Sequence, residues 1–432
     1  MRRMFMMNRY GVLMRQFDVR QGLPMRITGQ ANRIVYGNQM LNYMTQGYKR
    51  GMALAPDHKH VVLYGWQQGY TAHDDIEAGT YYNGSIPFST YVTKAIATND
   101  AYYLFGTSPL FYCYRWSDRS VDVFDVGGLG DVVSACLSPD GSKVFLHHNA
   151  APNVRAYDLA SKEFVDAPAT VGAGVTYNYN QSSEICCTSN GAFVAVCSSS
   201  SPNLSILDAE TLGVLSAKSN NNYTIYYWSE IMPHPHDENS VIVARNAGGT
   251  LMLNINCSTG EVEQINAWPA LNAAFSSAPN WFTTGMTYSK AADEIFVALT
   301  SSTAYAIAVL DGRTLAFKRQ EWIEDEGLPL ANHLNTDNSF NNCVKLRLVE
   351  DDCHQITGTV RDINNAPCAR TVRAFRRSDG VCMAQTESDA TTGDYRLLLP
   401  DAEPYDVQFQ ALDGENLNDL FFARSEPEPI TV

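Results

Sequence analysis

The sequence lacks the apolar segments that would direct a protein into or across a membrane. After the cationic start, the first apolar run covers only Met4 to Met7, whereas a secretion signal needs roughly 7–15 apolar residues. No uncharged apolar stretch approaches the ~20 residues of a membrane-spanning helix. We therefore expect a protein that is made in the cytosol and is not inserted into a membrane.

Several signatures of enzyme chemistry are also missing. The chain has no G-x-S-x-G nucleophile turn, no glycine-rich phosphate loop and no H-E-x-x-H zinc motif. Its ten cysteines include the neighbours Cys186 and Cys187 but form no C-x-x-C pair. We interpret them as buried thiols and not as a disulfide or metal framework. From the sequence we assign no catalytic, cofactor-binding or metal-binding residue and expect no cofactor.

Positive charge is scarce. Charged residues make up 18% of the chain, the formal net charge is −15, and the pI is near 5.0. Because each phosphate contact needs a local cation, binding to nucleic acid or anionic lipid is unfavourable. We expect protein or glycan partners.

What the chain does contain favours β-structure. Hydrophobic residues make up 45% and aromatic residues 11%, with 23 tyrosines, a composition suited to half-buried strands. The length of 432 residues exceeds what one core usually supports, so a repeat array with an added module is expected. The sequence therefore predicts an all-β protein.

A unit of two polar turns recurs six times. Each turn contains one Asp, Asn or Glu, which we call the first-turn and the second-turn residue, and the two are always 18 positions apart. The pairs are Asp57 and Asp75, Asp100 and Asp118, Asp140 and Asp158, Asn190 and Asp208, Glu238 and Asn256, and Asp293 and Asp311. Four second-turn residues are followed three positions later by Ser or Thr, in DLAS, DAET, NCST and DGRT. We interpret these as Asx turns that close hairpins and not as metal sites.

The first-turn residues are 43, 40, 50, 48 and 55 positions apart, close to the ~40–50 residues of a four-stranded propeller blade. From about residue 50 to 320 the units resemble the blades of WD40-like or YVTN-like β-propellers, although the Gly-His and Trp-Asp signatures are missing. ANRIVYGNQMLNYMT near the N-terminus offers two more strands. We expect this segment to close a seventh blade, because a ring must join its ends to avoid bare strand edges; six blades are the alternative.

The periodicity ends after Gln320. We assign residues 1–320 to the propeller, 321–342 to a linker that is acidic and then Asn-rich, and 343–432 to a small β-sandwich. Five β-rich runs fall in the last part: CVKLRLVEDD, ITGTVRD, TVRAFRR, YRLLLP and YDVQFQAL. In the last run Tyr405, Val407, Phe409 and Ala411 alternate with polar residues, which predicts one core-facing side. We expect a chain without residues 341–432 to fold as a soluble propeller.

The C-terminal part resembles the carboxypeptidase-regulatory-like (transthyretin-like) sandwich, an Ig-like β-sandwich. The matching residues are Gly358, Val360, Asp362, Pro367, Thr391, Gly393, Tyr395 and Leu397. Asn365-Ala366 replaces the usual glycine before the proline. PCARTVRAFRRSDG, SDATTGDY and NDLFFAR make residues 353–432 similar to the version at the ends of tailed-bacteriophage virion proteins, which implies a structural module and not a catalyst.

Two groups of polar residues have competing interpretations. Arg370, Arg373, Arg376 and Arg377 form a basic cluster that could dock onto an acidic neighbour, but a solvated strand face balanced by nearby carboxylates is the preferred interpretation. The histidine pairs His58 and His60, His147 and His148, and His234 and His236 could begin a metal site. We favour ordinary turn residues for those in DHKH and HPHDEN.

These observations favour a non-enzymatic structural protein of a phage virion. The resemblance implies an adaptor or receptor-facing part of the tail more than of the capsid, assembled in the host cytoplasm and present in several copies among other virion proteins. A host surface protein or glycan is a further candidate partner. The alternative is a propeller hydrolase or lactonase with a metal ion in the central channel.

Overall fold

The structure is a computed structural model of the whole chain. It describes residues 2–7, 13–23, 25–27, 32–33, 50–55, 60–65, 72–75, 80–82, 92–98, 100–106, 110–125, 131–171, 183–220, 223, 225, 229–245, 252–265, 282–300, 305–321, 323–324, 345–350, 353–410 and 420–430. These residues form strands and turns and contain no α-helix. No helix in this part of the chain has the length and apolar character needed to span a membrane. The expectation of an all-β protein is confirmed.

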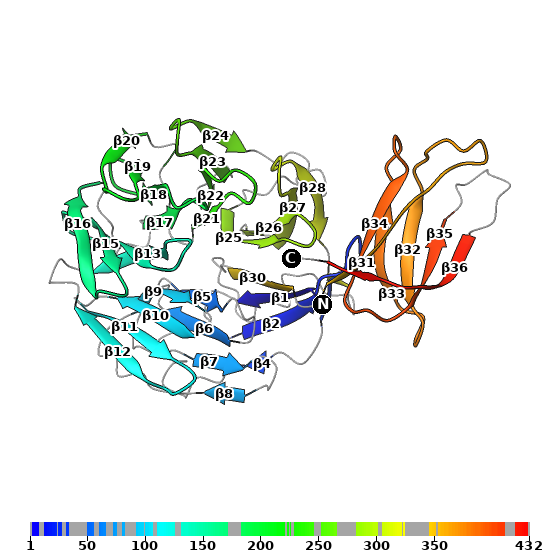
Figure 1. Cartoon of the computed structure of the whole chain (residues 1–432), viewed down its shortest axis with the longest axis horizontal. Helices are drawn as coiled ribbons and strands as arrows, with labels where there is room; N and C mark the ends of the chain where they lie inside the picture. The colour runs from blue at the N-terminus through cyan, green and yellow to red at the C-terminus, as the bar shows by residue number, and fades with distance from the viewer. Residues whose placement is uncertain are drawn as a thin grey trace.

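Six four-stranded antiparallel sheets follow one another along the chain (Figure 1). The first holds β5 (Arg50–Leu54), β6 (His60–Gly65), β7 (Ala72–Asp75) and β8 (Thr80–Tyr82). The second holds β9 (Val92–Ala97), β10 (Ala101–Gly106), β11 (Leu110–Arg115) and β12 (Val121–Asp125). The third holds β13 (Val132–Leu137), β14 (Lys143–His148), β15 (Val154–Asp158) and β16 (Glu163–Ala169).

The other three repeat this order. The fourth holds β17 (Ser183–Cys187), β18 (Phe193–Ser198), β19 (Leu204–Asp208) and β20 (Val214–Lys218). The fifth holds β21 (Glu230–Pro233), β22 (Ser240–Ala244), β23 (Met252–Asn256) and β24 (Val262–Ile265). The sixth holds β25 (Phe282–Ser289), β26 (Glu294–Thr300), β27 (Tyr305–Asp311) and β28 (Phe317–Glu321). Repeated four-stranded sheets of this kind are consistent with a β-propeller-like architecture.

A further sheet combines strands from distant parts of the chain, in the order β29-β3-β2-β1-β30, with β4 beside β2. We call it the closing sheet. Its strands are β1 (Arg2–Met7), β2 (Leu13–Asp18), β3 (Met25–Ile27), β4 (Asn32–Arg33), β29 (Ile323–Glu324) and β30 (Lys345–Glu350). β30 pairs antiparallel with β1 from Arg2↔Glu350 to Met7↔Lys345. Of the segment expected to supply two strands, the described part is β4, and the rest lies outside the described residues.

The first strands of neighbouring sheets lie against each other around a circle. β5 contacts β9, β9 contacts β13, and the series continues through β17 and β21 to β25. β30 contacts both β25 and β5, so the closing sheet stands between the sixth and the first sheets. Figure 1 shows the resulting ring.

Apolar side chains are buried between neighbouring sheets. One core joins Ile242 and Met252 of the fifth sheet to Ile295 and Val297 of the sixth, and similar cores join each of the first four sheets to the next. Because the fourth and sixth sheets cover both faces of the fifth, its inner strand β22 is buried at every position, whereas its outer strand β24 has no buried position. Burial between sheets fixes each sheet against its neighbours.

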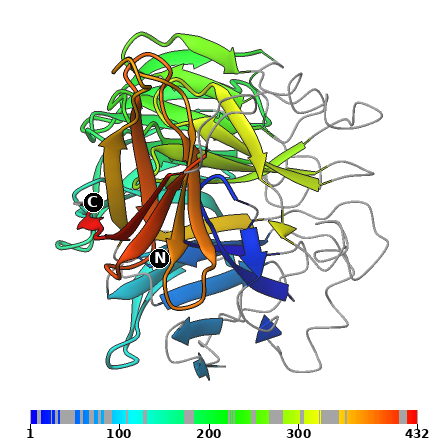
Figure 2. The ribbon, with the colours of Figure 1, turned by 90° about the vertical axis from the view of Figure 1, so that its right-hand side faces the viewer.

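Two further antiparallel sheets share one core, and we call residues 353–430 the C-terminal unit. It lies beside the ring in Figure 1 and in front of it in Figure 2. One sheet has the order β34-β31-β37 and the other β33-β32-β35-β36. The strands are β31 (His354–Thr359), β32 (Thr371–Arg376), β33 (Cys382–Glu387), β34 (Asp394–Leu399), β35 (Tyr405–Phe409), β36 (Leu420–Ser425) and β37 (Glu428–Pro429). In β35, Tyr405 and Val407 are buried and Asp406 and Gln408 are not, as predicted; Ala411 lies outside the described residues.

The glycines and turn residues of the C-terminal pattern have structural roles. A Cβ on Gly358 would lie 2.7 Å from the Tyr395 hydroxyl oxygen, because the tyrosine ring covers this glycine. Gly393 has φ +78° and would meet the Val360 carbonyl. Asn365 adopts φ +64°, so the asparagine supplies the left-handed backbone that a glycine would otherwise provide.

β30 lies in the closing sheet and not in the C-terminal unit. Its sequence, KLRLVE, belongs to the run that we assigned to residues 343–432, and β29 lies within the expected linker. The local pattern of β30 could not show this, because an apolar strand fits either sheet equally well. The pairing with β1 decides it, and the ring therefore includes residues up to Glu350.

Candidate functional site

The innermost strands of the ring carry a buried charged pair. Glu184 of β17 is 4% exposed, and its Oε2 lies 2.8 Å from Lys94 Nζ of β9. Ser134 of β13, the strand between them, donates its hydroxyl to the same oxygen at 3.0 Å. The group joins three consecutive sheets. Its carboxylate is already neutralised by the lysine, so the arrangement favours a structural link between sheets.

Side chains of one inner strand also bond the backbone of the next. Ser134 Oγ accepts from Ile185 N at 3.3 Å, Glu230 Oε2 from Met286 N at 2.8 Å, and Thr287 Oγ1 from Leu348 N at 3.1 Å. The innermost strand is the edge of its sheet, so these backbone groups have no neighbouring strand on that side. The neighbouring sheet supplies the missing partners.

The predicted Asx turns are confirmed by their hydrogen bonds. Asp208 Oδ1 accepts from Glu210 N at 3.1 Å and from the N and Oγ1 of Thr211 at 2.8 and 2.9 Å. Asp158, Asn256 and Asp311 accept from the same positions of their own turns. These bonds lower the pKa of the Asp158 and Asp208 carboxyls. The turns are structural.

Asp118 differs from the other second-turn residues. The third strand of its sheet ends at Arg115, whose N donates to Ser120 O at 3.0 Å, just as Asp208 N donates to Gly213 O. Arg115 thus takes the place of Asp208 and forms an ion pair with Asp122 at 2.8 Å. Asp118 lies within the turn and accepts from Ser120 N. The side chains of Asp57 and Asp75 lie outside the described residues.

The described histidines of the three pairs make contacts within one sheet or between neighbouring sheets. His234 Nδ1 accepts from the backbone N of His236 and Asp237 at 3.1 and 3.0 Å, and burial lowers the pKa of His234. His236 Nε2 lies 2.5 Å from Asp293 Oδ1 in the next sheet. His60 stacks on Trp116 with ring centroids 4.4 Å apart. His147 and His148 are buried in β14, and His58 lies outside the described residues.

Among the described residues, no three His, Cys, Asp or Glu side chains form a group that could hold a metal ion. The nine cysteines in this part of the chain form no disulfide, and Cys343 lies outside it. Burial raises the pKa of Cys187 and Cys257 to about 12. These thiols are therefore protonated and unreactive at neutral pH.

The basic cluster is balanced within the chain. Arg376 NH2 lies 2.6 Å from Asp379 Oδ2, and Arg377 Nε lies 3.6 Å from Asp406 Oδ1. Arg373 donates to Gln385 Oε1 at 2.7 Å. The two arginines with carboxylate partners agree with the preferred interpretation of a balanced strand face.

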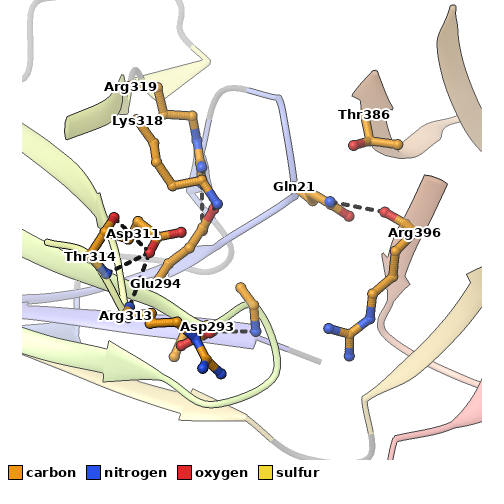
Figure 3. A network of polar contacts seen from close by, with 12 residues as sticks. Gln21, Asp293, Glu294, Asp311, Arg313, Thr314, Lys318, Arg319, Thr386 and Arg396 are labelled. Carbon is orange, nitrogen blue, oxygen red and sulfur yellow. Dashed lines mark hydrogen bonds and ion pairs between the residues drawn. The ribbon is translucent and has the colours of Figure 1, made fainter. Parts of the chain in front are cut away.

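The junction between the ring and the C-terminal unit contains polar contacts that the sequence analysis did not predict (Figure 3). Gln21, in the turn between β2 and β3, donates its amide to Arg396 O at 3.0 Å and accepts from Leu398 N at 2.8 Å. On the ring side, the buried Glu294 carboxylate pairs with Arg319 at 2.6 Å and Lys318 at 3.0 Å. At this junction the ring meets the C-terminal unit, whose two sheets have a core of their own.

One signal for this contact is present in the sequence. β2 is the third strand of the closing sheet counted from β30, and it ends at Asp18 as the third strands of other sheets end at Asp158 or Asp208. Three positions later stands Gln21, where the others have Ser or Thr. A longer carboxamide thus replaces the short hydroxyl in the turn after β2, and this is the turn that contacts β34.

Comparisons with known proteins give no family. No protein-family model matches the chain, and no curated protein matches it either. Among solved structures, one chain described as "Kuenenia stuttgartiensis Hydrazine Synthase" has a TM-score of 0.46 at 12% identity, over 63% of this chain and 86% of that chain. A chain from "Crystal Structure of Mitotic Checkpoint Complex" has a TM-score of 0.45 at 13% identity, over 63% of this chain and 77% of that chain. These scores are too low to carry an argument.

Proposed function

We propose that this protein is a non-enzymatic structural component of a tailed-bacteriophage particle. It acts in the tail as an adaptor between virion proteins or as a receptor-facing module, in several copies and after assembly in the host cytoplasm. The observation that carries the proposal is the sequence pattern of residues 353–432, which resembles a module at the ends of tailed-phage virion proteins.

The finer architecture belongs to the same proposal. We propose a propeller of seven blades, with the closing sheet as the seventh, followed by a sandwich of the carboxypeptidase-regulatory-like type. The circle of contacting first strands supports seven blades. The C-terminal unit supports the sandwich type in three places. The Tyr395 ring leaves no room for a side chain at Gly358, the Val360 carbonyl and a positive φ require glycine at Gly393, and Asn365 takes the left-handed backbone of the glycine that it replaces.

The inner strands fit a structural role better than catalysis. Glu184 is already paired with Lys94, and the backbone N–H groups of Ile185 and Leu348 on the inner edges donate to side chains of the preceding sheet. Sheets whose inner edges are hydrogen-bonded to their neighbours are held rigidly and present a fixed surface to partner proteins. This agrees with an adaptor, whose task is to hold neighbours at set positions.

The direct test is the composition of purified particles. Quantitative mass spectrometry should find the chain in intact particles at a fixed copy number relative to the other virion proteins, and a tagged copy should be imaged on the tail. Absence from washed, intact particles would overturn the proposal.

A second measurement separates the hydrolase or lactonase alternative. Purified protein is analysed for bound calcium and zinc and assayed against ester and lactone substrates. A stoichiometric metal together with turnover that Glu184→Gln abolishes would establish the enzyme and refute the structural role.

A further inference from the structure

Within the described part of the chain, the C-terminal unit and the ring are joined at two points. The first is covalent, since β30 ends at Glu350 and β31 begins at His354. The second is the turn between β2 and β3, in which Leu23 N donates to Arg20 O at 3.3 Å. A short covalent connection alone leaves a unit able to rotate, whereas a second contact at a distance from it removes that freedom.

The second contact falls on the edges of both sheets of the C-terminal unit. β33 is the outermost strand of one sheet and β34 of the other, and the two strands are neighbours. Gln385 N of β33 donates to the Gln21 carbonyl at 2.9 Å. Arg396 O and Leu398 N of β34 bond the Gln21 carboxamide. One glutamine therefore pairs three backbone groups on two sheet edges, as a neighbouring strand would.

The two residues beside Gln21, Arg20 and Gly22, also contact the backbone of β33. Gly22 has φ +66°, and a Cβ on it would lie 2.2 Å from Gln385 O, so both its conformation and its surroundings require glycine. Arg20 is 8% exposed and donates from NH1 to Cys382 O at 3.1 Å. Three consecutive residues thus contact the backbone of β33 and β34, a degree of fit that a chance contact would not have.

We propose that the neighbouring edges of β33 and β34 form a docking site for a glutamine-glycine turn, and that the chain's own Arg20–Gly22 turn occupies it as a latch. The occupied site holds the ring and the C-terminal unit as one rigid body. It also covers two strand edges that would otherwise be open to pairing with another chain. The inference is independent of the phage assignment, because it rests on contacts within one chain.

The test uses the full-length chain and amide hydrogen exchange. In Gln21→Ala, exchange at Leu398 and at Gln385 should rise together by about tenfold or more, since release of the turn exposes both edges. The matched control is Thr211→Ala, which alters the corresponding position of the fourth sheet, and it should leave both amides unchanged. If Leu398 alone becomes faster, a single hydrogen bond has been lost and the latch is refuted. Unchanged exchange at both amides refutes it as well.

A second variant reaches the same contact by another route. Gly22→Ala keeps the Gln21 side chain but places a methyl group against Gln385 O. Small-angle X-ray scattering should show a broader distribution of intramolecular distances for Gly22→Ala and Gln21→Ala than for the control. Exchange within the fourth and fifth sheets should stay as in the unaltered chain, which shows that the ring is folded. Scattering identical to the control in both variants would overturn the rigid coupling.

Discussion

Asp208 and Asn256 take the same place in neighbouring sheets, and their side chains accept the same backbone hydrogen bonds. An aspartate and an asparagine are interchangeable here because the turn needs an acceptor oxygen and not a charge. The residue after the Ser or Thr has a left-handed backbone in each case, at Lys162, Leu212, Gly260 and Leu315. The acceptor side chain of the second-turn residue is therefore shared by these hairpins, whereas glycine at the left-handed position is not required.

Replacing Asp208 tests this view. Asp208→Ala removes the acceptor for three hydrogen bonds at a largely exposed turn, so we expect a loss of about 1 kcal/mol in the free energy of unfolding. Asp208→Asn is the control, because it places at this position the residue that Asn256 provides in the next sheet, and it should cost little. Urea denaturation measures both. Equal losses in the two variants would show that the charge, and not the acceptor, stabilises the turn.

The lowered pKa of Asp140 predicts how the stability of the fold changes with acid. Hydrogen bonds from Ser138 and Ser142 lower its pKa from 3.8 to about 2. A carboxyl whose pKa is lower in the folded state stabilises the fold above its unfolded pKa and loses that contribution as the pH falls towards the folded pKa. The stabilisation that Asp140 provides should therefore be constant from pH 7 to about pH 5 and be lost between about pH 4 and pH 2. In Asp140→Asn, the drop in melting temperature over that window should be smaller than in the unaltered chain; an equal drop would contradict the assignment.

At the scale of the strands, the constant spacing of 18 residues predicts the hairpins but not their register. Lys143 pairs with Asp158 and Phe193 with Asp208, whereas Ser240 pairs with Asn256. The first-turn residue lies at different distances from the strand that follows it, because polar side chains can close a turn from several positions. In the second sheet the third strand ends at Arg115, so the second-turn residue Asp118 lies three positions beyond the end of that strand.

The hydrogen bond between the Thr287 hydroxyl and Leu348 N at the inner edge of the ring can be tested by mutation. Thr287→Val keeps the side-chain shape but removes the acceptor for Leu348 N, so we expect a loss of about 1–2 kcal/mol in stability and faster exchange at the Leu348 amide. Thr287→Ser, which retains the hydroxyl, should preserve protection at this amide. Full protection in the valine variant would show that another group satisfies Leu348.

For the whole molecule, the position of β30 changes the expectation for a deletion of residues 341–432. That deletion removes the strand that pairs with β1 and contacts both β25 and β5. The closing sheet would lose its innermost strand and leave a bare edge inside the ring.

Two truncations make this testable. A chain ending at residue 352 should be soluble and unfold cooperatively, whereas one ending at residue 344 should aggregate or melt at a clearly lower temperature. Differential scanning calorimetry compares them. If the two chains melt alike, β30 contributes little to ring closure, and if both aggregate, the C-terminal unit is needed for folding.

The sequence by itself determined the strands, the hairpin turns and the burial of six of the nine described cysteines, whereas Cys136, Cys368 and Cys382 are only partly buried. These features depend on residues a few positions apart, such as Asp208 and Thr211, so local spacing reveals them. Only the tertiary structure decided that β30 pairs with β1 and that Gln21 reaches β33 and β34. An apolar strand has no preference of its own among sheets, and a glutamine has none among backbone groups. Their partners are set by the closure of the ring, which brings β1 beside β30 and the turn after β2 beside the C-terminal unit.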